Sequence, residues 1–272
     1  MRLLQTTCSV YLLFLLSFMI GIGAISAEEI AKEKVDEDTF VSVSYDEFKE
    51  KKPEYEIKME TPIFRNVKDT FFELKLNHAL KKEATDKRAT FITKAMAAAK
   101  ELKDKGEEIR PHQLFVEGQL KMNGEMVSHY SETYLFQGGA HGVTEVQTLN
   151  FLNGNKVKLL TFQDLFQEET AYQEFINKKI KQEIQKRIDE DIAYFEGEEG
   201  FQTVKDDQTF YFDDGNLVIL FDQYEIAPGY VGIPAFQISM EELKEYIKPN
   251  IYDAVKNSKS LSNEEQIGEK KE

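Results

Sequence analysis

The 272-residue chain contains no tryptophan, a single cysteine and four histidines. Because Cys8 has no second cysteine to pair with, a disulfide within the chain is excluded, and packing alone must hold the fold together. The four histidines follow no metal-ligand spacing, and no serine lies in a nucleophile elbow. The motifs in this sequence therefore predict no catalytic residue, no metal and no cofactor.

Basic residues are scarce relative to acidic ones. The chain has 34 lysines and arginines against 49 aspartates and glutamates, which gives a formal net charge of −15. Such a charge repels phosphates, so nucleic acid is not expected as a partner. The acidity favours a basic partner through electrostatic steering, or it serves only the solubility of an exported protein. The composition leaves both interpretations open.

An uncharged amino-terminal run indicates export. Residues 1–27 are predicted to be a signal peptide, with Arg2 before the apolar run from Val10 to Ile25 and small residues behind it. The alternative is an uncleaved anchor, since the run approaches the roughly 20 residues that span a bilayer. Residues 28–38 are predicted to be an acidic linker. We expect a protein that is secreted or lies on the extracellular face of a bacterial cell envelope, with membrane contact only if the signal is uncleaved.

Strand and helix patterns alternate along the remaining chain. Alternating apolar residues predict strands at 41–45 and 55–59 that end at Pro62, then at 114–122, 126–136, 143–151, 210–212 and 217–221. Apolar positions at helical spacing predict helices over 66–105 and 172–192, and a capping box at Ser239–Glu242 begins a last helix that stops before Pro249. This order predicts an α+β fold: antiparallel sheets made of hairpins, each packed by a long helix.

Two loops hold the candidate binding residues. The first is the glycine-rich segment 137–142, with Gly138, Gly139, His141 and Gly142 between two predicted strands. Its histidine is a ligand, a base or a packed ring, and His129 on the preceding strand can approach it across the hairpin. The second is segment 221–234, which mixes aromatic residues, prolines and glycines. Its Tyr224 and Tyr230 are candidates for a binding rim, and a packed crossover is the alternative.

These loops also carry a resemblance to known families. Gln137–Gly142, Leu159–Phe166, Phe210–Val218 and Phe221–Pro234 resemble the domain of unknown function DUF3298. The region from Val41 to about Val127 resembles DUF4163, which accompanies the catalytic unit of PdaC-type peptidoglycan deacetylases. The resemblance implies a DUF4163-like domain at 39–127 and a DUF3298-like domain at 128–250. The polar composition of the chain's end predicts a flexible C-terminal tail at 251–272.

The same pair of domains forms the extracellular part of RsiV-type, lysozyme-responsive anti-sigma factors. The resemblance therefore implies an exported binding or sensor domain without catalysis, which recognises a wall glycan or a basic wall-directed protein such as lysozyme. The alternative is a cell-wall-active enzyme, or an accessory subunit of one, with a site around His141. No sigma-binding segment precedes the apolar run, so a sigma factor is not expected as a partner.

Overall fold

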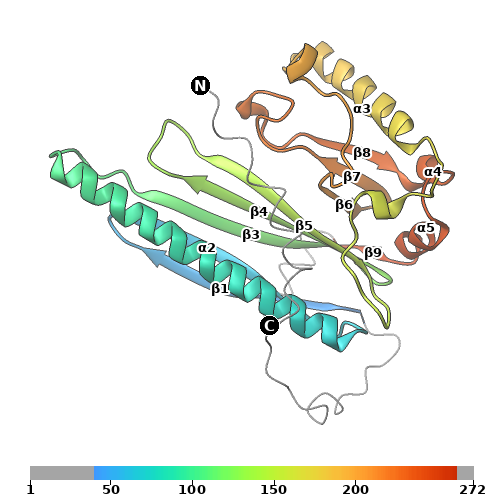
Figure 1. Cartoon of the computed structure of the whole chain (residues 1–272), viewed down its shortest axis with the longest axis horizontal. Helices are drawn as coiled ribbons and strands as arrows, with labels where there is room; N and C mark the ends of the chain where they lie inside the picture. Colours follow the sequence, from blue (N-terminus) through green and yellow to red (C-terminus); the bar gives the residue numbers. More distant parts are fainter. Residues whose placement is uncertain (1–39, 262–272) are drawn as a thin grey trace, which may run out of the picture. The chain divides into compact units, whose positions relative to one another are not determined.

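A five-strand ladder with a long helix on one face forms the first half of the fold (Figure 1). The computed structural model describes residues 40–261. The predicted signal peptide, the linker at 28–38 and residues 262–272 of the predicted tail lie outside the described residues. Within 40–261, no helix has both the length and the apolar character that a membrane span requires.

The larger sheet has the strand order β1-β2-β3-β4-β5. Its strands are β1 (Ser42–Lys51), β2 (Tyr55–Arg65), β3 (His112–Asn123), β4 (Met126–Phe136) and β5 (Val143–Leu152). Neighbouring strands pair antiparallel except β2 and β3, which are parallel because helix α2 (Thr70–Asp104) crosses between them. A short strand β9 (Lys259–Ser260) pairs with the end of β3.

Helix α2 is one unbroken helix, although the middle of the predicted helix is polar. Asp69 begins it by accepting a hydrogen bond from the Phe72 N–H at 3.0 Å, and Gly106 with a φ of +72° follows its end. Two clusters of buried apolar side chains, around Phe64 and around Phe91, fill the space between this helix and the sheet. Packing on the sheet therefore outweighs the weak apolar character of the helix centre.

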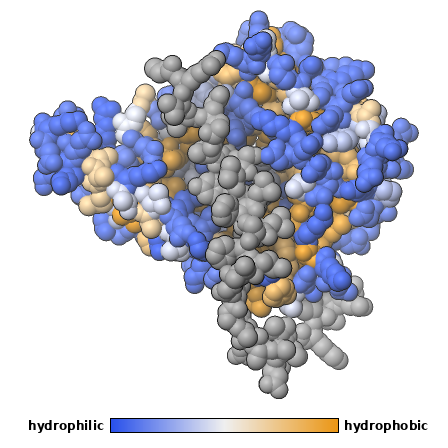
Figure 2. All heavy atoms as spheres, viewed as in Figure 1, coloured by the Kyte–Doolittle hydropathy of each residue, from blue (hydrophilic) through white to orange (hydrophobic). Residues whose placement is uncertain are grey.

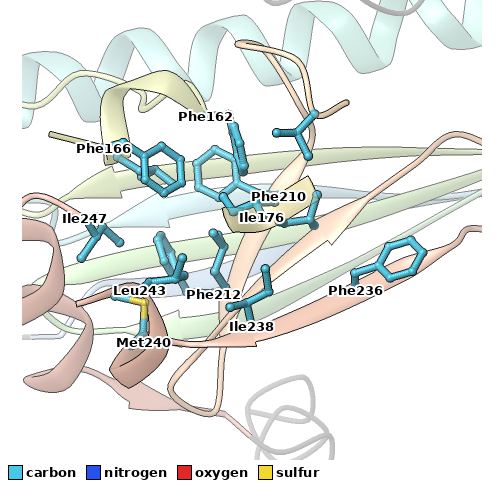
Figure 3. Close-up of a cluster of buried hydrophobic side chains, with 14 of the residues drawn as sticks. Phe162, Phe166, Ile176, Phe210, Phe212, Phe236, Ile238, Met240, Leu243 and Ile247 are labelled. Carbon is cyan, nitrogen blue, oxygen red and sulfur yellow. The ribbon is translucent and has the colours of Figure 1, made fainter. Parts of the chain in front are cut away.

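The second half is built on a smaller antiparallel sheet of order β6-β7-β8. Its elements are α3 (Tyr172–Asp189), β6 (Phe210–Asp213), β7 (Asn216–Leu220), β8 (Ala235–Ser239), α4 (Met240–Leu243) and α5 (Pro249–Lys256), with short 3₁₀ turns at Gln163–Leu165, Gly197–Glu199 and Gly229–Val231. Figure 3 shows aromatic and aliphatic side chains from these elements, such as Phe162, Phe210 and Ile176, converging on one core.

The two sheets share buried contacts. Ser128 on β4 accepts a hydrogen bond from the Phe212 N–H at 2.9 Å, and the Asn150 side chain donates to the Phe210 carbonyl at 2.8 Å. Val146 on β5 packs against Val218 on β7. Helix α2 therefore covers one face of the larger sheet, and the smaller sheet covers part of the other.

The predicted α+β class, with sheets of hairpins packed by helices, is confirmed. Two details differ from the prediction. Strand β2 continues through Pro62. Beyond Met59 this strand pairs only with β1, so its other edge is free of strand pairing and the missing N–H of Pro62 costs no strand hydrogen bond. The boundary expected between residues 127 and 128 falls inside β4.

The predicted tail begins too early. Pro249 starts helix α5 instead of ending the fold, as proline does well at the first helical position. Ile251 and Val255 on this helix are buried in the same core as the smaller sheet. Residues 251–256 therefore belong to the packed fold, which corrects the expectation of a flexible tail from residue 251.

Candidate binding surface at the glycine hinge

The glycine-rich segment 137–142, called the hinge below, is the loop that joins β4 to β5. The strand pairing ends at Leu135 and Val143, immediately before and after it. Gly138 has a φ of +80°, a conformation that side chains disfavour. At Gly142 an added Cβ atom would lie 2.4 Å from the Tyr134 ring, so glycine is required there. A Cβ added to Gly139 would meet no atom closer than 3.9 Å.

His141 projects from the hinge and is exposed to solvent. The Tyr224 hydroxyl lies 3.3 Å from each of its ring nitrogens, and its Nδ1 lies 3.3 Å from the Gly142 carbonyl oxygen. The two rings are 6.0 Å apart between centroids and inclined by 30°. Tyr224 holds a φ of +70°, which is unusual for a residue with a side chain. The contact therefore brings together candidate residues from two separate loops.

The segment 222–234, called the crossover loop below, is fastened to the hairpin by a glutamine. The Gln223 side chain accepts from the Thr144 N–H on β5 at 2.8 Å and donates to the Gly229 carbonyl at 2.7 Å. Gly229 is required because a Cβ there would lie 2.1 Å from the Tyr224 ring. Tyr230 follows in the same loop with 74% of its surface exposed. We call the exposed side chains of His141, Tyr224 and Tyr230 the rim.

An aromatic pair continues the rim across the larger sheet. Tyr134, which lies against Gly142, stacks on Phe115 of β3 with a centroid separation of 6.0 Å. The Lys58 ammonium on β2 lies 4.8 Å from the Phe115 ring centroid. These side chains share the face opposite α2, since their positions pair across the strands. The pair of Tyr134 and Phe115 thus lies next to the hinge, on the face of the larger sheet opposite α2.

Acidic side chains lie close to the crossover loop. Burial raises the pKa of Asp222, and the negative charges of Glu225 and Glu145 raise it further, while Lys205 opposes them. The Lys205 ammonium pairs with Glu225 at 2.5 Å. Hydrophilic residues predominate on the face of the molecule shown in Figure 2. Asp222 and Glu225 in the crossover loop and Glu145 on β5 thus place acidic side chains in this region, with Lys205 as the opposing charge.

The other histidines do not join His141. His129 is fully buried on the opposite face of β4, where its Nε2 lies 3.1 Å from the Tyr45 hydroxyl. The predicted approach of His129 to His141 across the hairpin is therefore wrong. His129 pairs with Leu149, six residues before the last β4–β5 pair at Leu135 and Val143, and its ring is buried against Tyr45. Among residues 40–261, no group of three or more histidine, cysteine, aspartate or glutamate side chains is placed to hold a metal ion.

Sequence reasoning missed one residue at the hinge. His112, the first residue of β3, is buried with 6% of its surface exposed, and its Nε2 is 3.4 Å from where a Cβ on Gly138 would lie. A buried polar residue at a strand start gives no signal in a single sequence.

Family models match both halves of the chain. Residues 48–144 match the model described as deacetylase PdaC, and residues 163–241 match the one described as protein of unknown function DUF3298. The predicted resemblance to DUF3298 is confirmed for residues 163–241. The resemblance of the first region to a domain of PdaC-type deacetylases is confirmed by the match to the PdaC model.

Two named relatives come from Bacillus subtilis (strain 168). The chain is 26% identical over 239 residues to anti-sigma-V factor RsiV, a match covering 86% of this chain and 80% of that protein. It is 29% identical over 131 residues to peptidoglycan-N-acetylmuramic acid deacetylase PdaC, covering 47% of this chain and 27% of that enzyme.

A solved structure shares the fold. The crystal structure of a DUF3298 family member from Bacteroides fragilis NCTC 9343 superposes with a TM-score of 0.63 at 18% identity. The match covers 79% of this chain and 97% of the other. The packing of the two sheets described above is therefore an architecture found in a solved protein.

Proposed function

We propose that this chain is an exported sensor or binding domain of a bacterial cell envelope, without catalysis of its own, and that its ligand docks on the rim. The observation that carries the proposal is the contact between Tyr224 and His141, which joins the two loops into one exposed surface. The relatives support the setting, because one is an anti-sigma factor and the other acts on peptidoglycan.

The chemistry of the rim favours a basic wall-directed protein, such as a lysozyme, over a wall glycan. Exposed tyrosines such as Tyr230 provide large, rigid contact areas at low entropic cost, which suits either ligand. The acids beside the rim and the chain's charge of −15 add attraction for a cationic surface. A neutral glycan gains nothing from that charge.

Isothermal calorimetry with the exported chain separates these ligands. We expect binding heat with lysozyme, and an affinity that weakens from low to moderate ionic strength because surface charges are screened. Cytochrome c, a basic protein without a role at the wall, is the control for unspecific charge attraction. Heat with peptidoglycan fragments and none with lysozyme would assign the rim to the glycan. No heat with either ligand would contradict the proposal.

The enzyme alternative and the absence of a sigma-factor partner stay predictions. Within residues 40–261, the hydrogen-bonding groups recorded around His141 are Tyr224 and the Gly142 carbonyl, and neither is a carboxylate. Release of acetate or of soluble sugars from purified peptidoglycan, lost in His141→Ala, would favour the enzyme. A pull-down with sigma factors tests the other prediction.

A further inference from the structure

His112 holds an unpaired polar atom inside the fold. Its Nδ1 is the one buried side-chain nitrogen or oxygen within residues 40–261 that has no hydrogen-bond partner. Leaving a buried polar atom unpaired is unfavourable, so native proteins rarely do it. The His112 main chain is satisfied, because its N–H donates to the Glu54 carbonyl at 3.0 Å. The unpaired atom thus belongs to the imidazole ring and not to the backbone.

The hinge closes directly on this ring. A Cβ on Gly138 would lie 3.4 Å from the His112 Nε2 and 3.8 Å from its Cδ2. Gly138 also has the positive φ that lets the chain turn over the imidazole. The His112 ring therefore packs directly against Gly138 of the hinge, the same loop that contains His141.

Two aromatic side chains, Phe91 and Tyr55, lie around the ring on its other sides. Phe91 on α2 faces it with a centroid separation of 6.3 Å. Tyr55 on β2 is its partner in the parallel pairing, and the Tyr55 ring is buried against Phe91. A charge placed among these groups would lose its hydration without gaining an equivalent partner.

Among residues 40–261, no charged group contributes to the electrostatics of the His112 ring. The titratable groups of the surrounding elements are engaged elsewhere: Tyr55 donates to Glu50, which pairs with Lys52, Arg88 lies over the Phe48 ring, and His141 contacts Tyr224. Burial accordingly lowers the pKa of His112 below its ordinary value, and no charged neighbour opposes the effect.

We propose that His112 is a pH-sensitive latch of the hinge: the neutral ring packs beneath Gly138, and the protonated ring leaves its site and releases the loop. When the hinge opens, the ring regains contact with water and its ordinary pKa of about 6.5. The closed hinge then binds fewer protons than the open one, so acidification favours opening. Between pH 7.5 and 5.5, one such proton raises the open-to-closed ratio by up to about tenfold.

Nuclear magnetic resonance tests the latch without any ligand. Titration of the imidazole resonances identifies the protonation of His112, and relaxation dispersion of the amides of residues 138–142 reports the open population. We expect that population to rise up to about tenfold from pH 7.5 to 5.5. His112→Phe, which keeps a ring in the site but cannot be protonated, should remove the pH dependence.

A matched control and a second variant protect the conclusion. His78→Gln removes an exposed histidine on α2 and should leave the pH response of the hinge intact. If His112→Phe does not fold, His112→Gln offers a smaller uncharged side chain with the same expectation. Hinge amides that stay unchanged while His112 titrates would overturn the latch, and so would an unaltered response in either His112 variant.

Discussion

The Tyr224 hydroxyl lies 3.3 Å from both ring nitrogens of His141, although 83 residues separate the two in the chain. This contact connects the β4–β5 hairpin of the larger sheet to the loop between β7 and β8 of the smaller sheet. A ligand docked on the rim, as proposed, would therefore contact both halves of the protein at once. A change in how the halves pack would therefore alter the geometry of the rim.

Replacing Tyr230 should weaken ligand binding without loss of stability. The side chain is 74% exposed, so its removal leaves no cavity. We expect Tyr230→Ala to raise the dissociation constant for lysozyme by about tenfold or more, the size of a 1.4 kcal/mol loss at an aromatic contact. Calorimetry measures the affinity, and thermal unfolding should show an unchanged midpoint.

The control for Tyr230 is a second exposed aromatic residue, far from it along the chain. Phe71 on α2 has 59% of its surface exposed. Phe71→Ala should leave lysozyme affinity unchanged. Equal losses of affinity in the two variants would show that the crossover loop has no special part in binding.

A side chain at Gly142 should destabilise the hinge. Its Cβ would lie 2.4 Å from the Tyr134 ring, which cannot move freely because it stacks on Phe115. We expect Gly142→Ala to lower the free energy of unfolding by about 1–3 kcal/mol through overpacking. Urea denaturation measures the change.

Gly154 provides the comparison, since a Cβ there meets no atom within 4 Å. Gly154→Ala should change the free energy of unfolding by less than about 1 kcal/mol, in the range of surface substitutions. If Gly142→Ala were equally mild, the close approach of Tyr134 to the hinge would not exist in solution.

Removing the Ser128 hydroxyl should loosen the joint between the two sheets. This hydroxyl is buried, accepts from the Phe212 N–H at 2.9 Å and donates to the Asn150 side chain at 2.5 Å. Ser128→Ala leaves a buried N–H unpaired, so we expect a loss of about 1–3 kcal/mol of stability. Ser44→Ala at an exposed site of β1 is the control. An equal effect of both substitutions in urea denaturation would be evidence against this joint.

Asp222 should make the protein less stable as the pH rises. Its pKa in the folded state is raised, first by burial and then by Glu225 and Glu145. The folded protein therefore holds this proton more tightly than the unfolded chain does. The resulting stabilisation is complete below the unfolded pKa of about 3.9 and is lost as the pH rises through the higher folded value.

The substitution Asp222→Asn removes the loss of stability that comes from ionising this buried carboxyl group in the folded protein. We expect the variant to be more stable than the unaltered protein at pH 7, with an advantage that disappears near pH 4. Midpoints of thermal unfolding across this range measure it. A variant that is less stable at pH 7 would mean that the carboxylate makes a favourable contact in solution, contrary to the expected sign.

Much of the fold was predictable because its signals are local. Asn123-Gly124 between two alternating runs marks the β3–β4 hairpin, and Ser239 caps a helix as its capping box predicts, accepting from the Glu242 N–H at 3.3 Å. The errors at Pro62 and at residue 251 have another origin. A proline ends an element only if its missing N–H is needed, and that depends on which neighbour the strand or helix has.

The residues of the candidate site can be picked out of the sequence, but their arrangement cannot. The glycines of the hinge, His141, Tyr224 and Tyr230 stand out by composition, because such clusters of glycine and aromatic residues are rare inside strands. Nothing local, however, says that Tyr224 contacts His141 or that His129 faces the other way with Tyr45. His112 gave no signal at all, since its burial depends on α2 and the hinge folding over it.

The sequence by itself determined the hairpins, the two long helices, the acidic charge and the residues of the two loops, because backbone preference and side-chain periodicity act over a few neighbours. Only the tertiary structure decided that β2 and β3 pair parallel, that α5 belongs to the core, and that the hinge lies over His112 beside Tyr224. These features arise from contacts between segments that are distant in the chain. Their free energy comes from burial and close packing, which the pattern of a single segment does not record.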